Sequence, residues 1–119
     1  MKISHDKKLL AIWSLKVREN ADFRCELCGK KSGTLNAHHF YGRKNRSTRY
    51  WLPNGICLCY TCHKGGTKSA HESPEYFRSE MIKIKGVLWL KELTNRWQQI
   101  SKPEYEKVKK YLNGDCNNY

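Results

Sequence analysis

The chain has 119 residues, enough for one compact domain and too few for two of ordinary size. Its 23 lysines and arginines outnumber its 11 aspartates and glutamates, giving a formal net charge of +12. No stretch has the length and apolar character of a signal peptide or a membrane span, which excludes a secreted or membrane-embedded protein and predicts a cytoplasmic one.

The positive charge is typical of a protein that binds a phosphate backbone. A basic domain without such a partner is the alternative. Membrane-surface binding would need a helix with a clean apolar face, whereas the basic residues here are spread along the whole chain. The charge therefore favours a nucleic acid as partner.

The first half of the chain predicts one helix and two short strands. The helix covers Asp6 to about Asn20, with apolar residues near a 3.6-residue period and Asp6 as its N-cap. The strands are expected at Leu35–Tyr41 and Ile56–Leu58. Between them, Gly42–Arg49 is expected to form a basic loop.

The second half predicts three helices: Pro74 to about Lys85, Val87 to about Ile100, and a last one ending near Leu112. Ser73 is the expected N-cap of the first, because proline suits the first helical position, and Gly86 ends it. Ser101–Glu104 resembles a capping box and would open the last helix. Residues 113–119 are expected to be loose.

The cysteines carry the firmest motif in the chain. Four of the six form two C-x-x-C pairs: Cys25, Cys28, Cys59 and Cys62. Each pair lets one tight turn, with Gly29 at a positive φ in the first, present two thiolates to one ion, and two such turns complete the tetrahedral shell of a structural zinc. Incidental buried cysteines and redox pairs are the alternatives. Cys57 is expected to be a small buried residue, and Cys116 receives no role.

The histidines extend this pattern. His38 and His39 lie between the two cysteine pairs, Asn54 follows them, and His63 comes directly after Cys62. This order resembles the HNH endonuclease family, over about residues 20–72. The resemblance implies an α+β fold with a small ββα-metal core and a structural zinc knuckle. Residues 1–119 would form a single domain, with one flanking helix at the N-terminus and a helical C-terminal extension over residues 74–112.

A second resemblance concerns the residues after this core. His71, Pro74–Phe77, Gly86 and Trp89 are similar to the phage recombination-type members of the NinG class. This resemblance implies a phage-encoded protein acting in the host cytoplasm, with branched DNA beside duplex DNA as an expected substrate.

The HNH resemblance assigns roles residue by residue. His39 matches the general base, and a neutral imidazole is suited to take a proton from water. His38 and His63 match the ligands of a catalytic divalent metal. Asn54 matches the residue whose amide ties the loop and orients the base. His71 has three open roles: a third metal ligand, a donor to the scissile phosphate, or a surface histidine.

The identity of the catalytic metal is left open among Mg²⁺, Mn²⁺, Ni²⁺ and Zn²⁺. Magnesium prefers oxygen ligands, whereas imidazoles suit the transition metals better. With one active site per chain, a double-strand break would need a homodimer or two successive nicks by a monomer.

Four basic residues between the histidine pair and Asn54 are the expected DNA contacts: Arg43, Lys44, Arg46 and Arg49. A solvated loop is the alternative for this run. For the whole chain, a zinc-containing nucleic-acid-binding module without catalysis is the alternative to a nuclease. The set of His38, His39, Asn54 and His63 favours the nuclease, because binding alone does not require it.

Overall fold

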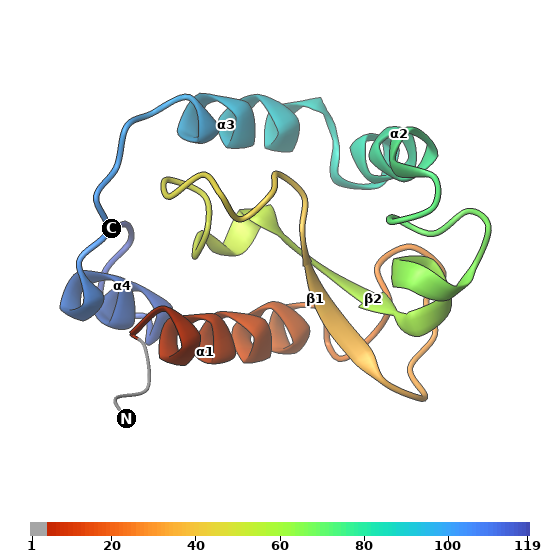
Figure 1. Ribbon diagram of the computed structural model, residues 1–119, viewed down its shortest axis with the longest axis horizontal. Helices are drawn as coiled ribbons and strands as arrows, with labels where there is room; N and C mark the ends of the chain where they lie inside the picture. Colours follow the sequence, from red (N-terminus) through yellow and green to blue (C-terminus); the bar gives the residue numbers. More distant parts are fainter. Residues whose placement is uncertain (1–4) are drawn as a thin grey trace.

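The computed structural model of the protein describes residues 5–119, and it is an α+β fold in which helices surround a two-stranded sheet (Figure 1). The helices and strands are α1 (His5–Asn20), β1 (Leu35–His39), β2 (Gly55–Cys59), α2 (Pro74–Lys85), α3 (Val87–Trp97) and α4 (Tyr105–Leu112). Two single turns flank β2: a 3-10 turn, η1 (Leu52–Asn54), and a π-helical turn, η2 (Thr61–Gly65). The predicted fold class is therefore confirmed at the level of an α+β domain.

The two strands pair in antiparallel fashion, and their register aligns the histidine pair with the start of β2. His38 lies opposite Ile56, and His39 lies opposite Gly55. Every residue of β2 is buried, whereas those of β1 are half-buried. A short continuous apolar run is what a strand covered on both faces requires.

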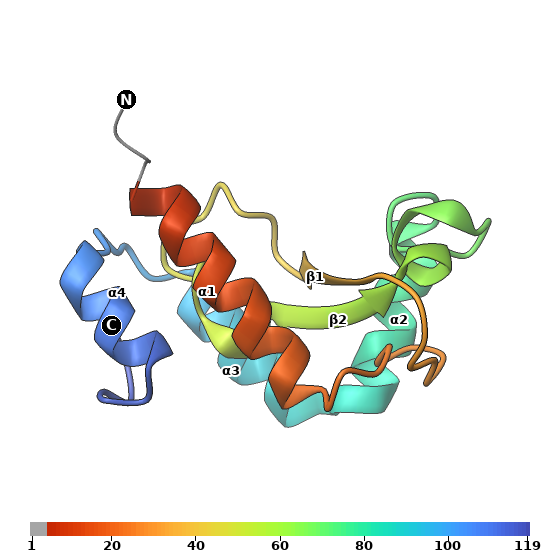
Figure 2. The ribbon, with the colours of Figure 1, turned by 90° about the horizontal axis from the view of Figure 1, so that it is seen from below.

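Each face of β2 belongs to a different core. Ile56 and Leu58 pack with Phe77 and Met81 of α2, next to the first cysteine turn. Cys57 points the other way, into the core that α1 and α4 form, as expected for a small buried residue. Figure 2 shows α1 crossing the hairpin obliquely, with α4 packed beside it.

The loop of residues 40–54 lies between α1 and α3 (Figure 1). Both helices hold it through polar contacts. From α1, Asp6 accepts hydrogen bonds from the Arg49 guanidinium and the Tyr50 hydroxyl. From α3, the buried Arg96 donates to the Ser47 carbonyl at 2.8 Å, and the Trp97 carbonyl accepts from the Asn45 amide at 2.8 Å.

Two expected helix starts are wrong. Since α1 already includes His5, Asp6 lies in its first turn and not at its N-cap. The last helix begins at Tyr105, with Glu104 as an extended N-cap, so the capping box at Ser101 does not form. A cap at Ser101 would require Lys102 to be helical, and a residue that precedes proline is disfavoured in the helical region of φ/ψ space.

No helix within residues 5–119 is both long and apolar enough to cross a bilayer.

The end of the chain is ordered by Arg96, contrary to the expectation of a loose tail. The Arg96 guanidinium donates to the Tyr119 carbonyl at 2.9 Å and lies over the Tyr119 ring. The Tyr119 hydroxyl accepts from the Tyr50 amide and donates to the Ser47 carbonyl. The position of this segment at the end of the chain predicted a loose tail, but Arg96, Tyr50 and Ser47 supply partners for Tyr119.

Candidate functional site

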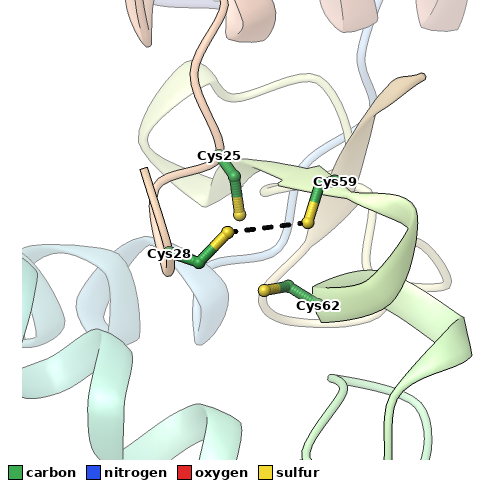
Figure 3. A group of neighbouring side chains, drawn as sticks. All are labelled: Cys25, Cys28, Cys59 and Cys62. Carbon is green, nitrogen blue, oxygen red and sulfur yellow. Dashed lines mark hydrogen bonds between the residues drawn. The ribbon is translucent and has the colours of Figure 1, made fainter. Parts of the chain in front are cut away.

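The four cysteines of the two C-x-x-C pairs converge on one point (Figure 3). Their sulfur atoms all lie within 4.8 Å of one another, and Cys28 Sγ is 3.7 Å from Cys59 Sγ. Zinc–thiolate bonds of about 2.3 Å set the edge of a regular tetrahedron at about 3.8 Å. The four cysteines, Cys25, Cys28, Cys59 and Cys62, can thus hold a structural metal such as zinc.

Backbone hydrogen bonds in and around the first turn favour the thiolate form of Cys25. Gly29 has a φ of 82°, the predicted positive value, and its amide donates to the Cys25 carbonyl at 2.8 Å. Burial alone would raise the pKa of the Cys25 thiol, but backbone hydrogen bonds from Cys59, Cys28 and Leu27 outweigh it and lower that pKa to about 7. Cys116 is exposed and lies outside the cluster.

A second cluster brings together three of the predicted histidines. The side-chain ligand atoms of His38, His63 and His71 lie within 4.8 Å of one another. Their rings meet edge to face, at interplanar angles of 70°, 71° and 70°. The three rings line an open hollow of about 310 Å³ together with His39, Arg43 and Lys64.

The cluster fits a divalent cation by the spacing of its nitrogens. His63 Nε2 and His71 Nε2 are 3.1 Å apart. Two nitrogens that bind one ion at about 2.1 Å lie about 3.0 Å apart in octahedral and about 3.4 Å apart in tetrahedral geometry. Burial, followed by the neighbouring histidines, lowers the pKa of His38 to about 3, so its ring is neutral as a ligand must be.

Local structure explains how His63 and His71 meet. His63 lies in the π-turn η2, directly after Cys62, so the two residues reach different clusters from adjacent positions. The chain then folds back, and the His71 amide donates to the His63 carbonyl at 3.1 Å. The helix of the expected ββα core is reduced to this five-residue turn, because Gly65 and Gly66 stop it.

His39 leaves β1 on the side opposite to His38 and lies against α1. Its ring stacks on Trp13, with centroids 3.9 Å apart and planes inclined by 13°. His39 Nε2 lies 2.9 Å from the Arg49 carbonyl oxygen. A carbonyl can only accept, so Nε2 carries the proton and the basic lone pair of the neutral ring is on Nδ1. Burial is the main reason that the pKa of His39 is lowered to about 4, despite this hydrogen bond.

Asn54 is fully buried and ties the ends of the loop together. Its Oδ1 accepts from the Tyr41 amide at 2.8 Å, while its Nδ2 donates to the carbonyls of Tyr41 and Thr48. Its own carbonyl accepts from the Phe40 amide at 2.8 Å. Asn54 therefore ties the chain directly after the histidine pair, and Thr48 further along the loop, to the start of β2, and it is not among the residues that line the histidine hollow.

The four basic loop residues differ in what they can reach. Arg43 lines the hollow, and Lys44 and Arg46 are exposed on the same loop. Arg49 instead points inward: its Nε donates to the Arg43 carbonyl at 2.7 Å and its Nη1 to Asp6 at 3.3 Å. The structure thus assigns the Arg49 guanidinium to the packing of the loop.

Two residues of this site were not identified from the sequence. Trp13 reads as an ordinary core residue of an amphipathic helix, and no local pattern connects it with His39. Lys64 follows His63 directly and also lines the hollow. Its position next to a predicted ligand is a signal that could have identified it.

Comparisons with protein-family models, curated proteins and solved structures found no match to this chain. The structure itself establishes a small α+β fold and a four-cysteine cluster able to hold a metal such as zinc. Function is therefore argued from the geometry of the histidine hollow.

Proposed function

We propose that the protein is a metal-dependent endonuclease of the HNH type that hydrolyses DNA phosphodiester bonds. The observation that carries the proposal is that one hollow is lined both by a set of possible metal ligands and by a possible general base. Three imidazoles, those of His38, His63 and His71, converge as ligands, and a fourth, that of His39, has its basic nitrogen available. A module that only binds nucleic acid has no need of this arrangement.

In the proposed reaction His39 acts as the general base. Its Nδ1 takes a proton from water while the water oxygen attacks phosphorus, and the bond to the 3′ oxygen breaks. The products are a 5′-phosphate and a 3′-hydroxyl, after the departing oxygen takes up a proton from solvent. A divalent cation held by the three other histidines would stabilise the charge that develops on the phosphate oxygens.

The electrostatics of the hollow favour an anionic substrate. Arg43 and Lys64 line it, and its lining residues include no carboxylate. A cation bound by neutral imidazoles keeps its full positive charge, which adds to this attraction. Imidazole ligands also favour Mn²⁺, Ni²⁺ or Zn²⁺ over Mg²⁺.

The test is cleavage of supercoiled plasmid with Mg²⁺, Mn²⁺, Ni²⁺ or Zn²⁺ added separately. We expect the unaltered chain to cut, and His39→Ala to lose at least about a hundredfold in rate. His5→Ala is the matched control, because His5 is exposed on α1 and stacks on Tyr105 away from the hollow. Absence of cutting by every version, or equal cutting by the wild type and His39→Ala, would show that the proposal is wrong.

The form of the first product tests the number of active sites that act together. One hollow per chain predicts nicked circles before linear DNA for a monomer, whereas a homodimer would give linear DNA directly.

A four-way junction supplied beside linear duplex tests the recombination-type substrate. Preferential cutting of the junction would support that substrate, and equal cutting would remove it.

A further inference from the structure

The closest ring contact of His39 is with a residue outside the hairpin. Trp13 lies in the middle of α1, and its indole is nearly parallel to the His39 imidazole at a centroid distance of 3.9 Å. Only 2% of the Trp13 surface is exposed. The indole therefore forms a wall against one face of the residue that the proposed reaction uses as its base.

The indole is itself held in place from two sides. Its Nε1 donates to the Trp51 carbonyl at 3.2 Å. Gly55, which lies opposite His39 in the sheet, leaves room for the ring edge, because a Cβ there would lie 2.9 Å from Trp13 Cζ2. A ring fixed by a hydrogen bond and by packing can transmit its orientation to its neighbour.

The imidazole needs such a second restraint. Its hydrogen bond to the Arg49 carbonyl fixes the direction of Nε2, but the χ2 angle of histidine is broad and the ring plane can still turn about that direction. A flat stack removes this freedom. Arg49 is tethered in turn by Asp6, so α1 supplies the wall and also steadies the segment that carries the accepting carbonyl.

We propose that Trp13 is a positioning residue: its indole holds the His39 ring in the plane that directs Nδ1 into the histidine hollow. The proposal rests on the proposed function, since it gives His39 the part of the base. It also makes the N-terminal helix α1 a component of the site, although α1 lies outside the residues of the HNH motif.

The kinetic test compares Trp13→Leu and Trp13→Phe with Val17→Ala in the full chain, with the cation that supports cleavage and a short labelled duplex. Val17 is the matched control, because it lies one turn further along α1, is equally buried, and packs on Gly55. We expect Trp13→Leu to lower kcat about tenfold to a hundredfold, with KM changed less than about twofold. Trp13→Phe should restore most of kcat, and Val17→Ala should keep it while lowering the melting temperature.

Retention of kcat by Trp13→Leu, or an equal loss in Val17→Ala, would overturn the proposal. A second readout covers the case in which Trp13→Leu does not fold. In the wild type without DNA, the stack on Trp13 predicts upfield-shifted His39 ring protons in NMR spectra assigned with His39→Gln, and the Arg49 carbonyl predicts an Nε2-protonated tautomer. Unshifted ring protons would also overturn the proposal. If the wild type cuts no DNA, the proposed function fails, whereas this measurement still decides whether Trp13 orients the ring.

Discussion

Arg43 and Arg49 belong to the same basic loop, yet they have opposite surroundings. Arg43 is exposed at the edge of the histidine hollow. Arg49 satisfies its guanidinium inside the protein, on the Asp6 carboxylate and the Arg43 carbonyl. Because Nε and Nη1 of Arg49 already have partners, its guanidinium has fewer donors left for a phosphate, and we expect Arg43 to contribute more to DNA binding than Arg49.

This difference predicts separate effects of the two alanine variants. Arg43→Ala should reduce the slope of log Kd against log salt for a DNA duplex by about 0.9, the value of one phosphate contact. Arg49→Ala should leave that slope unchanged and lower the free energy of unfolding by about 1 kcal/mol. Fluorescence anisotropy across a salt series and urea denaturation measure the two quantities. An equal change of slope in both variants would contradict this assignment.

At the scale of elements, the position of α1 on the hairpin depends on a glycine. A Cβ at Gly55 would lie 2.2 Å from Val17 Cγ2 and 2.9 Å from Trp13 Cζ2. The backbone of β2 therefore approaches α1 more closely than any side chain would permit. This close approach is what allows Trp13 to reach His39 on the neighbouring strand.

Gly55→Ala should accordingly push α1 away from the sheet and lower the free energy of unfolding by about 1–3 kcal/mol. Gly42→Ala is the control, because a Cβ at Gly42 meets nothing within 4 Å and should change stability by less than about 0.5 kcal/mol. Urea unfolding followed by tryptophan fluorescence measures both. Similar stabilities of the two variants would show that α1 tolerates the displacement.

The elements themselves could be predicted where their signals are local. Ser73 followed by Pro74 marked the start of α2, and Gly86, with a φ of 95°, separates α2 from α3 as expected. The start of α4 and the ordered tail could not be predicted in this way. The first was misread because a capping pattern ignored the proline within it, and the second because the contacts of Tyr119 come from α3 and from the loop of residues 40–54, which are distant in sequence.

At the scale of the whole molecule, two clusters of metal-ligand residues share one short turn. Cys62 belongs to the cysteine cluster and its neighbour His63 to the histidine cluster. The cysteine cluster also joins the end of β2 to the turn after α1, far apart in sequence. A structural zinc there would hold the segments that carry the histidine hollow, so its loss should affect both stability and the second cluster.

Removal of the structural metal tests this dependence. A strong zinc chelator, or Cys59→Ser, should lower the melting temperature by more than about 10 °C and remove the zinc equivalent that the cysteine cluster binds. Cys116→Ser is the matched control, because Cys116 is exposed and outside the cluster, and it should change neither quantity. Calorimetry and atomic absorption give the two values. A normal melting temperature in zinc-free Cys59→Ser would exclude a structural role.

In the candidate site, as in the helices and strands, residues with local sequence patterns could be predicted and residues that meet only through tertiary packing could not. The cysteine cluster was predicted from ligand spacing, because tight turns present paired side chains to one ion, whereas the convergence of His38 with His63 was predicted from the family resemblance. The position of His71 could not be predicted, because it depends on how the chain folds back on His63. Trp13 could not be predicted, since its contact with His39 depends on how a helix packs over a sheet.

The histidine pair has a further consequence for how the chain can change. His38 and His39 are chemically identical, and only the pairing of β1 with β2 decides which ring faces His63 and which faces Trp13. A slip of one residue would turn each ring to the opposite face of the sheet. That alignment is anchored at one end by Asn54 and at the other by the cysteine turns. We therefore expect insertions to be tolerated in residues 31–34, between the first cysteine turn and β1, whereas a one-residue change of the β1–β2 register would turn the proposed metal ligand and the proposed base away from their present neighbours.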